Sequence, residues 1–316
     1  MYYRFHFHNY SILLKFIVIE LNVKICIKSA VIIVDQYVKQ LDKLMNRFIL
    51  QSDRFVDYAC FPYGLLEYGQ TKKLSQKFVY DFEYFAFTKS TKTLKSIRAL
   101  LKNGHNEDAM ILVRSIFENY LSTRYLHEGN DENPLEAFII NPINVAFAFY
   151  NISKTGEITN RDKQKVGEIL NPSKFKMGKD KKYYSDFYAV LSLYAHCNFG
   201  IIDHYKEGGL YSIRKVNDNL LIRFYIVFVF TKLFELVVTV EGEDFPNKRV
   251  EKTCYKLVED SIELQRQIID ALREHYGNND KEELKHHSKR MRDMLNEMKK
   301  SLSEELGSLN KAENKK

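Results

Sequence analysis

Arg114 and Glu118 are the first residues in this sequence whose types and spacing suggest chemistry. They lie four residues apart, beside the apolar run from Met110 to Phe117, so on a helix both would project from the same face. An arginine can hold an anionic phosphate through a fork of donors, and a glutamate can orient it. The same pair also has a structural interpretation, as a buried ion pair that locks this helix to its neighbours.

A second group of polar residues follows in the segment from residue 183 to residue 202. Tyr188, Ser192, His196 and Gly200 recur every four residues and predict one stripe on a helix. Histidine takes and gives a proton near neutral pH, and Gly200 would let a ligand or another backbone approach His196. The alternative is a core histidine that is bonded to Ser192 or to a backbone carbonyl.

If the two helices touch, Arg114, Glu118, His196 and Ser192 would form one candidate catalytic site. His196 would be the general acid or base, Arg114 would stabilise phosphate charge, and Glu118 would orient either of them. Those roles describe a metal-independent ribonuclease. If the charged residues are structural, the chain is instead an interaction or scaffold module.

A basic segment lies between the two groups. Residues 161–182 hold eight basic and three acidic residues, a surplus of five positive charges in a chain of net charge +7. The end of this segment, followed by Tyr183 and Tyr184, is a candidate RNA site of phosphate contacts and base stacking. Its lysines are Lys174, Lys176, Lys179, Lys181 and Lys182. The alternative is a solvated loop.

Other motifs with chemistry are weak in this sequence. It has no Walker loop, no dinucleotide fingerprint and no nucleophile elbow. Glu283 and His286 form a single Glu-x-x-His half-site, whereas di-iron bundles need two such pairs and further carboxylates. No cofactor and no metal are therefore expected. The four cysteines show neither a Cys-x-x-Cys pair nor a disulfide framework, which favours a reducing cytoplasm.

The elements that position these residues are predicted to be helices, because five prolines and 13 glycines are few breakers for 316 residues. Apolar spacing and capping residues predict a helical hairpin over 72–126, turning at Asn103-Gly104. Further helices are expected at 135–150, in part of 161–182 and at 183–202. A short extended piece is expected at 210–216. The predicted fold class is an all-α, irregular multi-helix bundle.

Two apolar stretches, residues 12–34 and 220–240, are long enough to raise the question of membrane insertion. The first carries four charges on one helical face, and the second carries Arg223, Lys232 and Glu235. We therefore expect an amphipathic helix and a buried core helix, and membrane association is the weakest hypothesis. Residues 1–28 have an alternative interpretation, as loosely packed or upstream of the true start.

The C-terminal part of the chain is charged and predicts two packed helices. Leu284, Met291 and Met298 are spaced by seven, as are Leu295, Leu302 and Leu309, which resembles a coiled-coil seam. A helical hairpin, with homo-oligomer or helical-partner contacts through residues 250–310, is the prediction. Three segments follow for the chain: N-terminal amphipathic helices (1–60), a helical core (61–245) and charged C-terminal helices (246–316).

The run from Asn106 to Glu118, followed by Tyr125-Leu126, resembles the signature of an uncharacterised family of bacterial all-helical proteins. Those proteins also carry a later helix of the form Tyr…Leu-Ser-x-Tyr-x-His, to which the run from Tyr188 to His196 is similar. The resemblance covers residues 72–240. It implies a helical fold and, because the family is a domain of unknown function, no mechanism.

Such proteins are distantly similar to HEPN-type ribonuclease domains of toxin and abortive-infection systems, which pair an Arg and a His on one helix across a dimer. That similarity implies a setting in bacterial antiviral defence. The chain departs from the pattern, because its nearest pair is Arg98 and His105 with Gly104 between them. Any ribonuclease site here would take its Arg and His from different helices.

Overall fold

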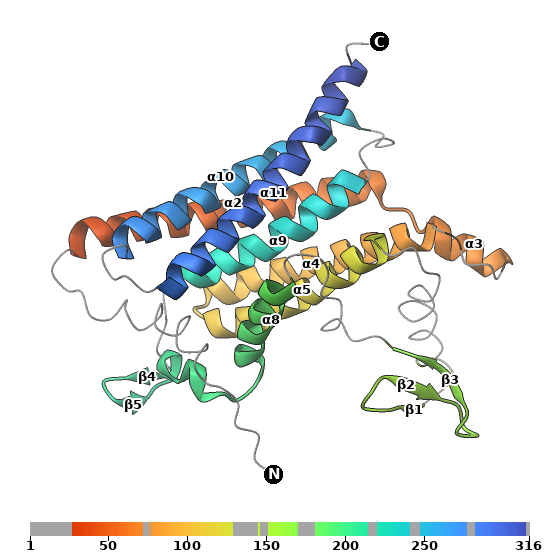
Figure 1. Ribbon diagram of the computed structural model, residues 1–316, viewed down its shortest axis with the longest axis horizontal. Helices are drawn as coiled ribbons and strands as arrows, with labels where there is room; N and C mark the ends of the chain where they lie inside the picture. The colour runs from red at the N-terminus through yellow and green to blue at the C-terminus, as the bar shows by residue number, and fades with distance from the viewer. Residues whose placement is uncertain are drawn as a thin grey trace.

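The computed structural model describes residues 27–71, 75, 77–128, 145, 151–169, 181–213, 220–240, 247–276 and 282–313. Long helices make up most of these residues and pack into one bundle (Figure 1), which confirms the all-α, multi-helix class. The bundle helices are α2 (Ile27–Ala59), α4 (Lys77–Lys102), α5 (Asn106–Glu128), α8 (Lys181–Ala195), α9 (Leu220–Val240), α10 (Lys248–Tyr276) and α11 (Glu282–Glu313). A shorter helix, α3 (Tyr63–Thr71), projects from one end of the bundle.

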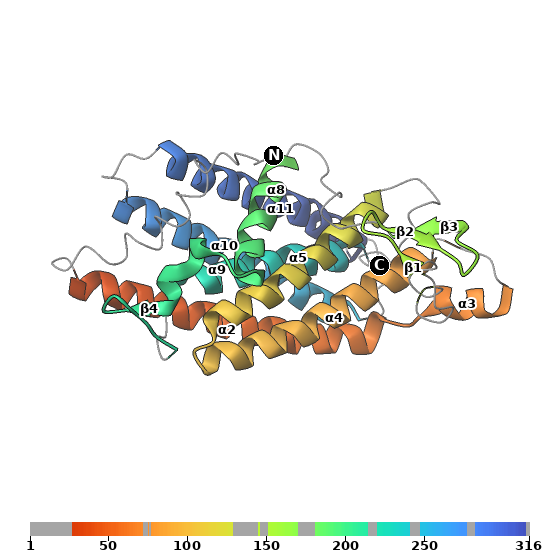
Figure 2. The ribbon, with the colours of Figure 1, turned by 90° about the horizontal axis from the view of Figure 1, so that it is seen from below.

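Helix α9 forms the centre of the bundle, as Figures 1 and 2 show, and contacts α2, α4, α5, α10 and α11. Its side chains are apolar on nearly every face, and Phe228, Phe230 and Phe234 are almost fully buried. Phe48 of α2 meets Phe230 and Phe234 edge to face, with centroids 5.4 and 5.0 Å apart. Each such ring contributes about 1.5 to 3 kcal/mol through burial. The predicted core helix over 220–240 is therefore confirmed.

The predicted helical hairpin is confirmed as α4 and α5. Helix α4 ends at Lys102, and Gly104 adopts the left-handed conformation with φ 78°. The amide of His105 then donates to the carbonyl of Leu100 at 3.0 Å, which closes the helix end. Because α5 begins immediately at Asn106, the two helices lie antiparallel and in contact.

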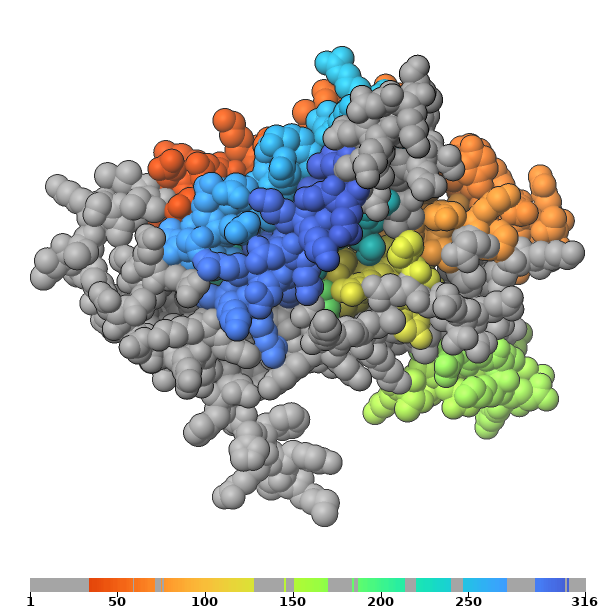
Figure 3. All heavy atoms as spheres, turned by 45° about the horizontal axis from the view of Figure 1, so that its top comes forward, coloured from red at the N-terminus to blue at the C-terminus, as the bar shows by residue number. Residues whose placement is uncertain are grey.

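Part of the predicted C-terminal seam is buried within the chain, on helices α10 and α11. Leu295, Met298 and Leu302 of α11 are buried, and so is Ile262 of α10. Arg292 forms an ion pair with Asp270 across the two helices. Figure 3 shows α10 and α11 in light and dark blue, lying side by side on one face. Part of the heptad-like seam thus already packs on the chain's own helices.

Between α5 and α8, residues 161–169 contain a strand and not the short helix expected within 161–182, and residues 170–180 of that range lie outside the described residues. Lys165–Glu168 form strand β3, which pairs antiparallel with β2 (Glu157–Thr159), and β2 pairs with β1 (Asn151–Ile152). The physical reason is a tight turn. Asn160 accepts from the amide of Gln164 at 2.9 Å, and Lys163 takes a positive φ of 63°, which a continuing helix would not allow.

Helix α8 ends earlier than predicted, so the helix expected over 183–202 is wrong after Ala195. Asn198 caps a new 3-10 helix, η4 (Phe199–Tyr205), by accepting from the amide of Gly200 at 2.7 Å. Strands β4 (Lys206–Glu207) and β5 (Leu210–Tyr211) follow as a hairpin that turns at Gly208-Gly209. The expected extended piece is confirmed at Leu210–Tyr211. We call residues 198–213 the arm, which projects from the bundle in Figure 1.

Some predictions fall outside the described residues. These include the structure of residues 1–26, most of the helix expected over 135–150, and the loop at 170–180. Buried residues from all three predicted segments, such as Leu41, Phe87 and Leu295, join one apolar core. Among the helices described here, none combines the length and apolar character that crossing a membrane requires.

Candidate functional site

Helix α5 carries the Arg114–Glu118 pair at the edge of the apolar core. Val113 and Phe117 of this helix are buried, whereas the side chains of Arg114 and Glu118 are 23% and 31% exposed. The Nε atom of Arg114 donates to Oε1 of Glu118 at 3.0 Å, as the four-residue spacing predicted. The pair is therefore half-buried, between core and solvent.

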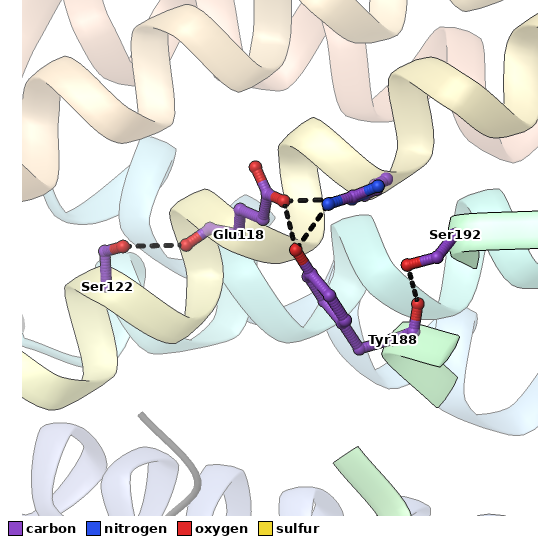
Figure 4. Close-up of polar contacts among 5 residues, drawn as sticks. Glu118, Ser122, Tyr188 and Ser192 are labelled. Atoms are coloured by element: carbon purple, nitrogen blue, oxygen red, sulfur yellow. Dashed lines mark hydrogen bonds and ion pairs between the residues drawn. The ribbon is translucent and has the colours of Figure 1, made fainter. Parts of the chain in front are cut away.

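Tyr188 of α8 joins the pair and completes what we call the Arg114 cluster, formed by Arg114, Glu118 and Tyr188. Nη2 of Arg114 donates to the Tyr188 hydroxyl at 2.5 Å, and that hydroxyl donates to Oε1 of Glu118 at 2.9 Å. The guanidinium also lies over the Tyr188 ring, with Cζ 4.7 Å from its centroid. Figure 4 shows Tyr188 reaching toward Glu118. Each member therefore contacts the other two.

The contacts within the Arg114 cluster favour the protonated forms of Arg114 and Tyr188. Burial alone would lower the pKa of Arg114, but its bonds to Tyr188 and Glu118 outweigh that effect and raise it. Burial, together with the neighbouring Glu118 carboxylate, raises the pKa of Tyr188. The tyrosine therefore keeps its proton at neutral pH and donates it in a hydrogen bond to Glu118.

This geometry suits a clasp between two helices. The guanidinium is engaged by a carboxylate and a hydroxyl, so a phosphate that approached Arg114 would compete with both. Next to the cluster, Phe117 of α5 meets Phe187 of α8 edge to face at 5.1 Å. The polar cluster and the ring contact together hold α8 on α5.

The other two predicted catalytic residues are not brought into the cluster. Ser192 donates through Oγ to the carbonyl of Tyr188 at 2.7 Å, within α8, as Figure 4 shows. His196 comes directly after the last residue of α8 and is exposed. Among the described residues, His196 has no hydrogen bond or ion pair with Arg114 or Glu118. The stripe that predicted their alignment is broken because the helix ends at Ala195.

The predicted RNA site lies mostly outside the described residues. Lys174, Lys176 and Lys179 belong to the segment 170–180, and Lys181 and Lys182 open α8 with side chains that are likewise not described. Phosphate binding by these lysines stays a prediction. In the described part of the chain, no three His, Cys, Asp or Glu side chains are grouped so as to hold a metal ion.

His204 of η4 is a buried histidine that was not among the predicted site residues. Its Nδ1 lies 3.1 Å from Oε1 of Glu107 in the first turn of α5, and its Nε2 lies 3.5 Å from the hydroxyl of Tyr194 in α8. The side chain of His204 is 1% exposed and that of Glu107 is 11% exposed. We call these three residues the His204 cluster. It joins the arm, α5 and α8 in the interior.

The His204 cluster contains a buried carboxylate, and this affects its neighbours. Burial raises the pKa of Tyr194, and the nearby Glu107 carboxylate raises it further. No sequence motif links the residues of the His204 cluster. Glu107 was interpreted as a first-turn residue at the start of a helix, and it is 97 residues away from His204.

Lys232 of α9 is a second buried ionisable residue whose surroundings were not predicted. It is 7% exposed, and its Nζ lies 5.6 and 5.8 Å from the ring centroids of Tyr120 and Tyr184. The two tyrosine hydroxyls are 3.1 Å apart, and Arg124 donates to that of Tyr184 at 2.9 Å. The charge that argued against membrane insertion is thus accommodated by two aromatic faces.

Comparison with known families finds one match. Residues 83–166 match a Family of unknown function (DUF5677). The matched segment holds most of α4, all of α5 and strands β1 and β2, and so it includes Arg114 and Glu118 but not Tyr188 or His196. A resemblance to a family of unknown function was expected over a longer stretch. No curated protein and no solved structure matches the chain.

Proposed function

We propose that this chain is a helical interaction module, in which the bundle holds the arm ready to bind a second copy of the chain. The observation that carries the proposal is the exposure of apolar side chains on the arm. Phe199 is 80% exposed, Leu210 75%, Tyr211 73% and Ile213 fully exposed. Four strongly exposed apolar side chains within residues 199–213 are more than a solvated segment requires, and exposed apolar surface commonly marks interaction sites.

The arm also has the geometry for self-association. Strand β5 pairs with β4 on one side only within the described residues, so its other edge is a template for another strand. Two copies of such an edge can pair about a two-fold axis, which is the commonest symmetry of homo-oligomers. Contacts through residues 250–310 belong to the same proposal, although the seam of α11 is partly occupied by the chain's own helices.

The anchoring of the arm supports a role in binding. His204 fixes η4 to α5 and α8, so the arm emerges from a defined point on the bundle. The Arg114 cluster strengthens the same junction by holding α8 on α5. A partner would therefore meet a pre-positioned surface, which lowers the entropic cost of binding.

Sedimentation velocity between 1 and 100 μM tests this function. We expect the wild type to dimerise and the Leu210→Ser/Tyr211→Ser variant to remain monomeric. Ile152→Ser/Val166→Ser is the matched control, because it removes two exposed apolar side chains from the β1–β3 sheet. A wild type that stays monomeric at 100 μM, or a control that dissociates as readily as the arm variant, would contradict the proposal.

A metal-independent ribonuclease-like effector of bacterial defence is the second candidate function. Its support is the partial exposure of Arg114 together with the exposed imidazole of His196, one residue beyond the helix that carries Tyr188. Expression of the wild type and of His196→Ala, with growth and total RNA integrity compared, tests it. Equal RNA patterns in the two cultures would remove this candidate.

A further inference from the structure

The first turns of α10 carry a concentrated positive charge that neither proposed function uses. Lys248, Arg249, Lys252 and Lys256, together with Thr253, line a shallow hollow of about 430 Å³ on the surface. Lys248, Lys252 and Lys256 are spaced by four and so lie on one face, with successive residues about 6 Å apart along the helix axis. The four cations are all exposed.

Among the described residues at the beginning of α10, basic side chains outnumber acidic ones. Residues 247–256 contain one acidic residue, Glu251, whose side chain is 1% exposed and lies 3.0 Å from Lys248. Lys256, at the far end, pairs with Glu259 at 2.8 Å and Asp260 at 3.3 Å. Within the described residues, the guanidinium of Arg249 has no ion-pair partner. The surplus of positive charge is therefore greatest at the beginning of the helix.

We infer that this face of α10 binds the phosphate backbone of single-stranded nucleic acid. A guanidinium and three ammonium groups are donors that proteins commonly use for phosphate oxygens, whereas the Thr253 hydroxyl already donates to the carbonyl of Arg249 at 2.8 Å. A flexible strand can place successive phosphates along the row of lysines. The lining offers no aromatic ring for base stacking and no apolar anchor for a bilayer, so the expected binding is independent of sequence and does not involve a membrane.

Fluorescence anisotropy of a labelled, mixed-sequence 20-nucleotide RNA, titrated with the full-length protein from 50 to 300 mM KCl, tests the inference. With four phosphate contacts we expect the logarithm of the affinity to fall with the logarithm of salt with a slope of about −3. Arg249→Glu/Lys252→Glu should weaken binding at least about tenfold at 50 mM KCl. The same charge change in Lys43→Glu/Lys92→Glu, at exposed positions on α2 and α4, should have a much smaller effect.

Several outcomes would overturn the inference. Absence of binding at 50 mM KCl would do so, and so would equal weakening by the α10 variant and its control. A Lys174→Glu/Lys176→Glu variant that abolishes binding while the α10 variant keeps it would place the site elsewhere.

Equally tight binding of a polyglutamate peptide of the same charge would identify the face as a docking site for acidic protein. Binding of phosphatidylserine vesicles without RNA would identify it as a lipid site. Dimerisation is a separate readout, so the arm proposal does not depend on these results.

Discussion

The Arg114 cluster and the His204 cluster both include residues of α5, and these residues lie about three helical turns apart or less. The two clusters differ in burial and in the number of elements that they join. The Arg114 cluster is half-exposed and starts from a pair within one helix. The His204 cluster is buried and joins residues of three separate elements. A half-exposed ion pair contributes little to stability, whereas removing one partner from a buried polar contact leaves the other partner without it in the interior and is costly. The Arg114 cluster, which the sequence indicates more clearly, is therefore expected to contribute less to the free energy of unfolding than the His204 cluster.

The largest expected effect is that of His204→Ala. This change leaves the Glu107 carboxylate and the Tyr194 hydroxyl without their imidazole partner in the interior, and we expect it to lower the free energy of unfolding by roughly 3 kcal/mol. Urea unfolding followed by circular dichroism measures the loss. His204→Gln, which retains a donor for Glu107, should lose less. If His204→Ala costs under about 1 kcal/mol, the cluster does not anchor the arm.

Substitutions in the Arg114 cluster should cost less, about 1 kcal/mol each for Arg114→Met and Tyr188→Phe, because solvent screens the half-exposed pair. Since the two residues touch, the double variant should lose less than the sum of the single variants, with a coupling of about 0.5 kcal/mol or more. Both singles and the double are compared by urea unfolding. Strict additivity would show that the hydroxyl and the guanidinium do not act together.

The buried carboxylate of Glu83, on the same α4–α5 hairpin, gives a comparison that depends on pH. Burial raises the pKa of Glu83 of α4 above its ordinary value of 4.5, although His127 of α5 lies 3.4 Å away and lowers it. The folded protein therefore binds this proton more tightly than the unfolded chain. Its contribution to stability is present below pH 4.5 and is lost as pH rises through the higher folded pKa.

Glu83→Gln removes that titration, so the variant should gain stability over the wild type as pH rises from 4.5 to 7.5. The difference at neutral pH should be on the order of 1 kcal/mol or less. Unfolding free energies of both proteins across this pH range measure it. The opposite trend, in which the wild type gains on the variant at higher pH, would mean that the ion pair with His127 outweighs burial.

Ser192→Ala and His196→Ala should have the smallest effects. Ser192 is bonded only to the carbonyl of its own helix among the described residues, and His196 is exposed. Both variants should therefore stay within about 0.5 kcal/mol of the wild type in thermal or urea unfolding. A larger loss for His196→Ala would reveal a contact that links His196 to the folded core.

The sequence predicted those parts of the fold that depend on local signals. The α4–α5 hairpin follows from helix spacing and from the Asn103-Gly104 turn, and α9 follows from an apolar stretch with few charges. The Arg114–Glu118 contact is equally local, because it spans one helical turn. Tyr188 was also named from the sequence, in the stripe with His196, so all three residues of the Arg114 cluster were candidates, and the structure adds the contact of Tyr188 with the other two.

The features that the sequence did not predict depend on contacts between distant parts of the chain or on single residues that start a turn. Asn198 ends the helical stripe by starting a new turn, and the tight turn at Asn160 leads into strand β3, which was not predicted. His204 and Glu107 could be paired only once the bundle had brought η4 to the start of α5. Apolar periodicity carries no information about which of nine histidines in the chain will be enclosed.

The position of α9 also indicates whether the matched segment, residues 83–166, can fold by itself. Residues 83–166 include α5 and most of α4, and both helices pack their apolar faces against α9, which lies outside that segment. A fragment limited to those residues would expose Phe87, Ile116 and Phe117 to water. The unit that can fold independently is therefore larger than the matched region and must extend at least through Val240, so deletion series that stop earlier should yield aggregating rather than inactive protein.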